Sequence, residues 1–226
     1  MKELIDGYTR FRKQIFPTQR PLFQRLATGQ SPSTLLITCS DSRIVPDLIM
    51  QTEPGDLFIC RNAGNMVPPY SDRTGGVSAT IEYAVLALNI ESIVVCGHSD
   101  CGAMKGVLHP EKLKDMPTVA SWLHHADTAR RLVHETYPAL DEQGLLRAVT
   151  EENVIAQLDH LRTHPSVASR LAQGRLQLFG WVFDIHSGEL KSFDPALSGF
   201  VPLDARVAPS ATAHPRLRQF LPQGAA

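Results

Sequence analysis

The stretch Thr34-Leu-Leu-Ile-Thr38, followed directly by Cys39-Ser-Asp-Ser-Arg43, decides the fold of this chain. Its first five residues include three that are β-branched and form an almost continuous apolar run, which is typical of a strand buried on both faces of a parallel sheet. Its last five residues are polar and carry a thiol, a carboxylate and a guanidinium. The stretch therefore predicts a central strand with chemistry at its carboxyl end.

Similar strands alternate with helical segments along the rest of the sequence. We predict strands at 57–61, 93–96 and 177–185, and helices at 46–52, from Gly76, at 117–136 and at 148–163. The turn at Gly188 leads into 190–193, which we expect to be an antiparallel edge strand. Strands alternating with helices favour an α/β fold, here a mostly parallel four-stranded sheet flanked by helices. We predict a single domain over residues 1–226.

The two ends of the chain are expected to lie outside this sheet. Residues 1–30 predict a helical arm, with Leu4, Tyr8 and Phe11 on one face of a first helix and Pro21 opening a second. We expect these helices to pack on a partner subunit, with packing on their own domain as the alternative. Residues 195–226 contain repeated prolines and predict an irregular tail.

Composition excludes several classes of protein. The formal net charge is −1, and we see neither a basic surplus nor a stacking-aromatic pattern, so we expect no nucleic-acid partner. No apolar run is long enough for a secretory signal or a membrane span, so we expect a cytoplasmic protein with no membrane partner. In that reducing compartment the four cysteines are expected to be ligands, nucleophiles or core thiols. We assign Cys60 and Cys96 to the core.

The remaining two cysteines and one histidine form a candidate metal site. Cys39 follows the strand 34–38, and the segment His98-Ser-Asp-Cys101 follows the strand 93–96. Ligands in such folds bind outside the carboxyl ends of the strands. Two thiolates and a neutral imidazole are ligands that zinc prefers, and a three-ligand set leaves a fourth position open. A zinc-bound hydroxide there would be a nucleophile for a small carbonyl-type substrate.

Asp41 and Arg43 stand close to this site in sequence. Asp41 has two possible roles, as a fourth ligand that closes the site or as an acceptor that orients the hydroxide. If Arg43 pairs with it in a bidentate fork, Asp41 is drawn off the metal and the site opens. Gly102 opens a predicted helix whose first N–H groups could receive an oxyanion.

These residues resemble those of the β-class carbonic anhydrases. The likeness rests on Cys39-Ser-Asp-Ser-Arg43 and His98-Ser-Asp-Cys-Gly102, and it extends through motifs such as Arg61-Asn-Ala-Gly-Asn65 and Gly180-Trp-Val-Phe-Asp184. Within the class the chain most resembles the plant-like branch that includes the bacterial cyanate-operon enzyme. The resemblance implies reversible hydration of CO2 to bicarbonate and a proton.

The resemblance also implies a role for each matching residue. One zinc ion per chain would bind Cys39, His98 and Cys101, with Asp41 as a conditional fourth ligand and Arg43 holding it away. The positions that match substrate-contacting residues are Gln30, Phe58, Tyr83 and Gly102. In the family the apolar wall comes partly from a neighbouring subunit, which implies a homodimer or a higher homo-oligomer.

One position departs from the family pattern. The branch with an inhibitory bicarbonate site carries tryptophan three residues before the first ligand, where this chain has Leu36. We therefore predict that this site is missing, together with the switch that puts Asp41 on the metal at low pH.

Three other functions are considered beside CO2 hydration. The first is hydrolysis of carbonyl sulfide or carbon disulfide, which β-class folds can also host. The second is a catalytically inactive zinc scaffold or sensor, which would need Asp41 or Arg43 to be lost or the site to be closed. A thiol redox protein is the third, but the sequence has no Cys-x-x-Cys pair.

Overall fold

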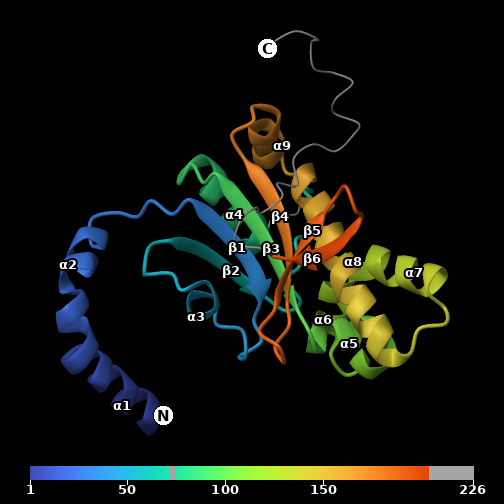
Figure 1. Cartoon of the computed structure of the whole chain (residues 1–226), viewed down its shortest axis with the longest axis horizontal. Helices are drawn as coiled ribbons and strands as arrows, with labels where there is room; N and C mark the ends of the chain where they lie inside the picture. The colour runs from blue at the N-terminus through green and yellow to red at the C-terminus, as the bar shows by residue number, and fades with distance from the viewer. Residues whose placement is uncertain (72–74, 204–226) are drawn as a thin grey trace.

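A six-stranded sheet forms the centre of the protein in a computed structural model that describes residues 1–71 and 75–203 (Figure 1). The strand order is β2-β1-β3-β4-β5-β6. The first four of these strands run parallel, and β5 and β6 are antiparallel to their neighbours. This confirms the predicted α/β fold with a mostly parallel sheet. The strands are β1 (Thr34–Cys39), β2 (Leu57–Asn62), β3 (Ser92–His98), β4 (Gln177–Phe183), β5 (Leu190–Asp194) and β6 (Gly199–Pro202).

The prediction of an irregular tail is wrong in part, because the tail contains the strand β6. It lies within 195–226 and pairs with β5, so the edge strand of the sheet is β6 and not 190–193. The chain reverses after β5 because the Asp194 carboxylate accepts a hydrogen bond from the Ala196 N–H at 2.8 Å and Ser198 takes a left-handed conformation, with φ of 49°. The rest of the predicted tail, 204–226, lies outside the described residues.

Three helices cover one face of the sheet: α4 (Gly76–Leu86), α8 (Glu142–Thr163) and α9 (Pro165–Ala172). Alternate residues of β1, β3 and β4 point toward them and form the main apolar core, because successive side chains of a strand point to opposite faces. This core contains Leu35, Ile37, Ile93, Val95 and Leu178 from the strands, and Ile81, Val85, Val154, Leu158, Leu161 and Val167 from the helices.

A second core lies beyond the carboxyl ends of β1 and β3. It contains the sulfur-bearing residues Cys39, Cys101, Met66 and Met104 and is enclosed by short helices and part of α8 (Figure 1).

The helices around this second core differ from two predictions. The expected helix 117–136 is divided into shorter ones. The helix α8 begins earlier than expected, because the Asp141 carboxylate caps it by accepting a hydrogen bond from the Gly144 N–H at 2.8 Å. The short helices are α5 (Gly102–Leu108), η2 (Pro110–Leu113), α6 (Pro117–Leu123), η3 (His124–Ala126) and α7 (Asp127–Thr136), while α3 (Pro46–Met50) follows β1.

The N-terminal arm extends away from the sheet (Figure 1). It consists of α1 (Lys2–Arg10), a π-helical segment (Phe11–Ile15) and α2 (Phe16–Leu26). The expected break before Pro21 is wrong: Pro21 lies inside α2, and the irregular turn precedes Pro17, which has no N–H to donate to it.

No residue of the arm is buried, and the apolar side chains of α1 are exposed. Leu4, Ile5 and Tyr8 are 72%, 57% and 59% exposed. Apart from the end of α2, where Leu26 lies against Gly55, the arm does not pack on its own domain, which goes against the alternative considered from the sequence. Packing on a partner subunit stays a prediction.

None of the helices in the described part of the chain is both long enough and apolar enough to cross a membrane.

Candidate metal centre

The parallel pairing of β1 and β3 brings the predicted ligands together. Cys39 is the last residue of β1 and His98 the last residue of β3, and the two strands are in register up to the pair Thr38 and Cys96. The chain then turns at Asp100, which has a φ of 57° and places Cys101 at the start of α5. Aspartate tolerates this left-handed conformation better than most residues do.

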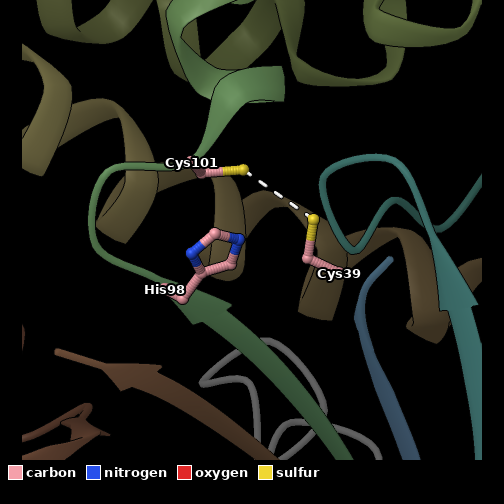
Figure 2. A group of neighbouring side chains, drawn as sticks. All are labelled: Cys39, His98 and Cys101. Atoms are coloured by element: carbon pink, nitrogen blue, oxygen red, sulfur yellow. Dashed lines mark hydrogen bonds between the residues drawn. The ribbon is translucent and has the colours of Figure 1, made fainter. Parts of the chain in front are cut away.

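The three candidate ligands point toward one another (Figure 2). The two cysteine sulfurs and a ring nitrogen of His98 all lie within 4.8 Å of one another, and the two sulfurs are 3.9 Å apart. All three residues are buried. The structure thus assembles a Cys2His group from two segments that are distant in sequence.

The imidazole of His98 is oriented for metal binding. Its Nδ1 lies 2.8 Å from the Ser99 carbonyl oxygen, which can only accept, so Nδ1 carries the proton and Nε2 keeps its lone pair. The Nε2 atom is buried and has no protein hydrogen-bond partner. A buried polar atom without a partner is costly, and a metal ion would satisfy it.

The two thiols also fit a metal. Hydrogen bonding to Cys101, assisted by His98 and by the Gly64 N–H, lowers the pKa of Cys39. The same contact with Cys39, together with burial, raises the pKa of Cys101. Two neighbouring sulfurs do not both ionise readily unless a cation joins them, and a zinc ion would supply that charge. The donor set and its protonation therefore suit Zn²⁺.

Asp41 lies beside this group but is engaged by Arg43. Its Oδ2 is 3.9 Å from the His98 Nε2, and both of its carboxylate oxygens accept hydrogen bonds from the Arg43 guanidinium. These hydrogen bonds hold the pKa of Asp41 well below its usual range. In this geometry Asp41 is turned toward Arg43, the arrangement expected of an open site.

Further polar contacts around Asp41 and Arg43 were not foreseen from the sequence. The Arg43 Nη1 donates to the Asp100 carboxylate at 2.9 Å, and that carboxylate also pairs with Lys105. Arg61 donates to the backbone carbonyls of Cys39 and Asp41, at 3.0 and 2.8 Å. The sequence signal for Arg61 was its place in the motif Arg61-Asn-Ala-Gly-Asn65, and the parallel pairing of β2 with β1 then places residue 61 next to the end of β1.

The four predicted substrate-contacting residues lie in two places. Gly102 is the first residue of α5, next to Cys101. Phe58 pairs with Leu35, whereas Cys39 pairs with Asn62, so Phe58 lies about 13 Å along the sheet from the level of Cys39 at roughly 3.3 Å per residue. Tyr83 contacts Phe58, with ring centroids 6.0 Å apart, and Gln30 precedes β1 at that same amino end. The chain does not bring these three residues to its own metal group.

The assignment of Cys60 and Cys96 as core thiols agrees with their burial. Cys96 is buried on the sheet face opposite α8, and burial raises its pKa to about 12. Cys60 is half-buried against the main core, and burial raises its pKa as well.

Comparison with known proteins gives consistent results. Residues 34–190 match the family model described as carbonic anhydrase. A carbonic anhydrase of Pseudomonas aeruginosa is 52% identical over 203 residues, covering 90% of this chain and 92% of that protein. The solved β-carbonic anhydrase CcaA is 46% identical with a TM-score of 0.89, covering 92% of this chain and 93% of that one. A structure from a study of two tetrameric β-carbonic anhydrases of Sordaria macrospora is 33% identical with a TM-score of 0.70, covering 84% and 92%.

Three findings lead to one conclusion. The carboxyl ends of parallel strands hold a Cys2His group, an arginine holds a carboxylate beside it, and relatives of this identity extend over nearly the whole chain. The chain belongs to the carbonic anhydrase family and has the β-class fold.

Proposed function

We propose that this protein catalyses the reversible hydration of CO2 to bicarbonate and a proton, with one zinc ion bound by Cys39, His98 and Cys101. The observation that carries the proposal is the pairing of Asp41 with Arg43, which leaves a fourth position of the metal group free. A catalytic zinc site keeps such a position, whereas a structural site is closed by four protein ligands.

Bound zinc would supply a Lewis acid that makes a water molecule nucleophilic near neutral pH. Asp41 orients that water, because an ionised carboxylate only accepts hydrogen bonds and its Oδ2 lies beside the ligand group. Arg43 keeps Asp41 both ionised and directed away from the metal. Gly102 is proposed to contact the substrate, since the space where a Cβ would stand is open apart from the neighbouring backbone of its own helix.

We propose that the protein acts as a homodimer or a higher homo-oligomer. Two features support this: the exposed apolar face of the arm, and the distance of Gln30, Phe58 and Tyr83 from the metal group of their own chain. In an oligomer, the same residues of a second copy would complete the site. Assignment to the plant-like branch, a link to cyanate breakdown and a cytoplasmic location remain predictions from the sequence.

Stopped-flow CO2 hydration with a pH indicator, measured together with zinc content, tests the proposed activity. We expect about one zinc ion per chain and fast hydration in the wild type. Asp41→Asn should reduce kcat/KM by about 100-fold while zinc stays bound, as expected for loss of a preorganised group at the reacting centre. The matched control is Asp127→Asn, which removes a surface carboxylate that is paired with His124.

A zinc-loaded wild type without CO2 hydration at any pH between about 6.5 and 9 would contradict the proposal, because that range spans the usual pKa of zinc-bound water. Carbonyl sulfide and carbon disulfide would then be assayed with the same protein. Inactivity toward all three substrates would favour the scaffold or sensor function.

A further inference from the structure

A peptide of the loop after β2 contacts one of the candidate zinc ligands. The Gly64 N–H donates a hydrogen bond to the Cys39 sulfur at 3.4 Å. Gly64 has a φ of 79°, and a Cβ at this position would stand 2.9 Å from the Ala103 Cβ. The absence of a side chain is thus what allows this peptide to lie so close to the ligand group.

Two amide side chains of α8 fix this loop from the other side. The Asn153 Nδ2 donates to the Gly64 carbonyl oxygen at 3.2 Å, and the Asn153 Oδ1 accepts from the Gln157 Nε2 at 2.8 Å. The Gln157 Oε1 in turn accepts from the Val67 N–H at 2.8 Å. A continuous hydrogen-bond path therefore runs from Gln157 through Asn153 and Gly64 to the sulfur of Cys39.

Both amides are deeply buried, with Asn153 1% and Gln157 0% exposed. Burial of an amide is unfavourable unless its polar atoms find partners, and here the partners are the loop backbone, the other amide and, for Gln157, also the His125 carbonyl oxygen and the His160 Nδ1. They stand four residues apart on one face of α8, so the helix sets their spacing. This arrangement fixes the position of the Gly64 peptide.

The contact matters because of what it does to the sulfur. An N–H donor directed at a thiolate draws electron density from it, so that the sulfur donates less charge to a bound cation. A metal ion bound by two thiolates acidifies its bound water less than one bound by nitrogen ligands does. Hydrogen bonds to the thiolates reduce their charge donation and so restore part of that acidity.

We propose that Asn153 and Gln157 are positioning residues, which aim the Gly64 N–H at Cys39 and so limit the charge that this thiolate gives to the metal. The inference rests on the proposed zinc site. It assigns to α8 a role in tuning that site, in addition to its packing against β3 and β4.

The test uses the full-length protein with Co²⁺ in place of zinc, because cysteine ligands give cobalt a sulfur-to-metal charge-transfer band. Asn153→Leu keeps the approximate volume of the side chain but cannot bind the Gly64 carbonyl. We expect the band to move to longer wavelength, as for a more electron-rich sulfur. Competition with a chelator should also show about tenfold weaker zinc binding, because the freed loop no longer fixes Cys39 in the binding geometry and this loss outweighs the gain from a more electron-rich sulfur.

Gln157→Met provides a second variant, which leaves Asn153 in place and should move the band in the same direction by less. The matched control is Val149→Ala, which weakens the core around α8 without touching the hydrogen-bond path and should leave the band unmoved. A band that stays in place in whichever of the two amide variants folds, or that moves equally in the control, overturns the inference. Absence of the band from the wild type would overturn the metal site itself, so the two failures are distinguishable.

Discussion

Arg43 holds Asp41 with two side-chain hydrogen bonds, from Nε to Oδ1 at 2.9 Å and from Nη2 to Oδ2 at 2.8 Å. The Arg43 backbone N–H adds a third, to Oδ1 at 3.0 Å. A bidentate pair of this kind fixes direction as well as distance. Asp41 therefore lies within reach of the metal group while its oxygens are engaged elsewhere.

Removal of the guanidinium should close the site. In Arg43→Met, Asp41 loses its partners and is free to turn toward the metal as a fourth ligand. We expect kcat/KM for CO2 hydration to fall by about 100-fold with zinc content unchanged. Arg147→Met, which breaks an exposed ion pair with Glu151, serves as the control and should keep full activity. Full activity in Arg43→Met would contradict the proposed role.

The same pair predicts a pH dependence of stability. Because Arg43 lowers the pKa of Asp41 in the folded state, the unfolded chain binds more protons in acid. The stabilisation is complete above the unfolded pKa of about 3.9 and is lost as the pH falls toward the folded value.

Urea unfolding of the wild type and Asp41→Asn between about pH 7 and pH 3 measures this effect. The difference in unfolding free energy should be constant at the neutral end and shrink at the acidic end. A difference that does not change with pH would show that the pair is not linked to stability.

The pH dependence of activity should follow a simple titration. Leu36 is buried on the sheet face with Cys96 and Trp181, and it stands where one branch of the family has tryptophan. We predict that hydration declines below neutral pH with a slope of one proton and without cooperative inhibition by bicarbonate. A steep, cooperative loss of activity below neutral pH would show that the switch is present.

Gly64 should tolerate no side chain. Gly64→Ala combines a left-handed backbone with a contact of 2.9 Å, and we expect it to cost about 2–4 kcal/mol of unfolding free energy. Gly174→Ala is the matched control, because Gly174 has a φ of 67° but no atom within 4 Å of a Cβ. It should cost about 1 kcal/mol, from the backbone alone. Equal losses in the two variants would contradict the packing argument.

Charges on the apolar face of the arm should separate the subunits. Ile5→Lys combined with Tyr8→Lys places two charges where we propose that a second copy packs, and burial of an unpaired charge is costly. Analytical ultracentrifugation should show a smaller assembly, and CO2 hydration per chain should fall with it. Lys13→Glu, in the adjoining π-helical segment, is the control. An unchanged assembly in the double variant would exclude the arm as the contact.

The strands and the ligand group were predictable because their signals are local. Apolar β-branched runs identify β1 and β3, and each ligand segment follows such a run directly. The strand β6 was missed because its four residues lie among prolines, where pairing depends on the turn at Ser198 and not on a hydrophobic pattern.

The contacts of Arg61, Asp100 and Asn153 could not be predicted for a different reason. Each of them reaches residues at least 20 positions away, so each depends on the tertiary arrangement. The distance of Phe58 and Tyr83 from Cys39 also needed the strand register, although the two residues match the family motif.

The register of β1 against β3 has a consequence for the order in which the chain folds and binds its metal. The two strands are paired from Thr34 and Ser92 to Thr38 and Cys96 by their own backbones, so the sheet delivers both halves of the metal group. Small zinc domains, in contrast, obtain their folding energy from the ion and are unfolded without it. This protein is therefore expected to mature in two steps, first folding and then binding its metal ion. It should also stay folded when that ion is removed and bind it again afterwards.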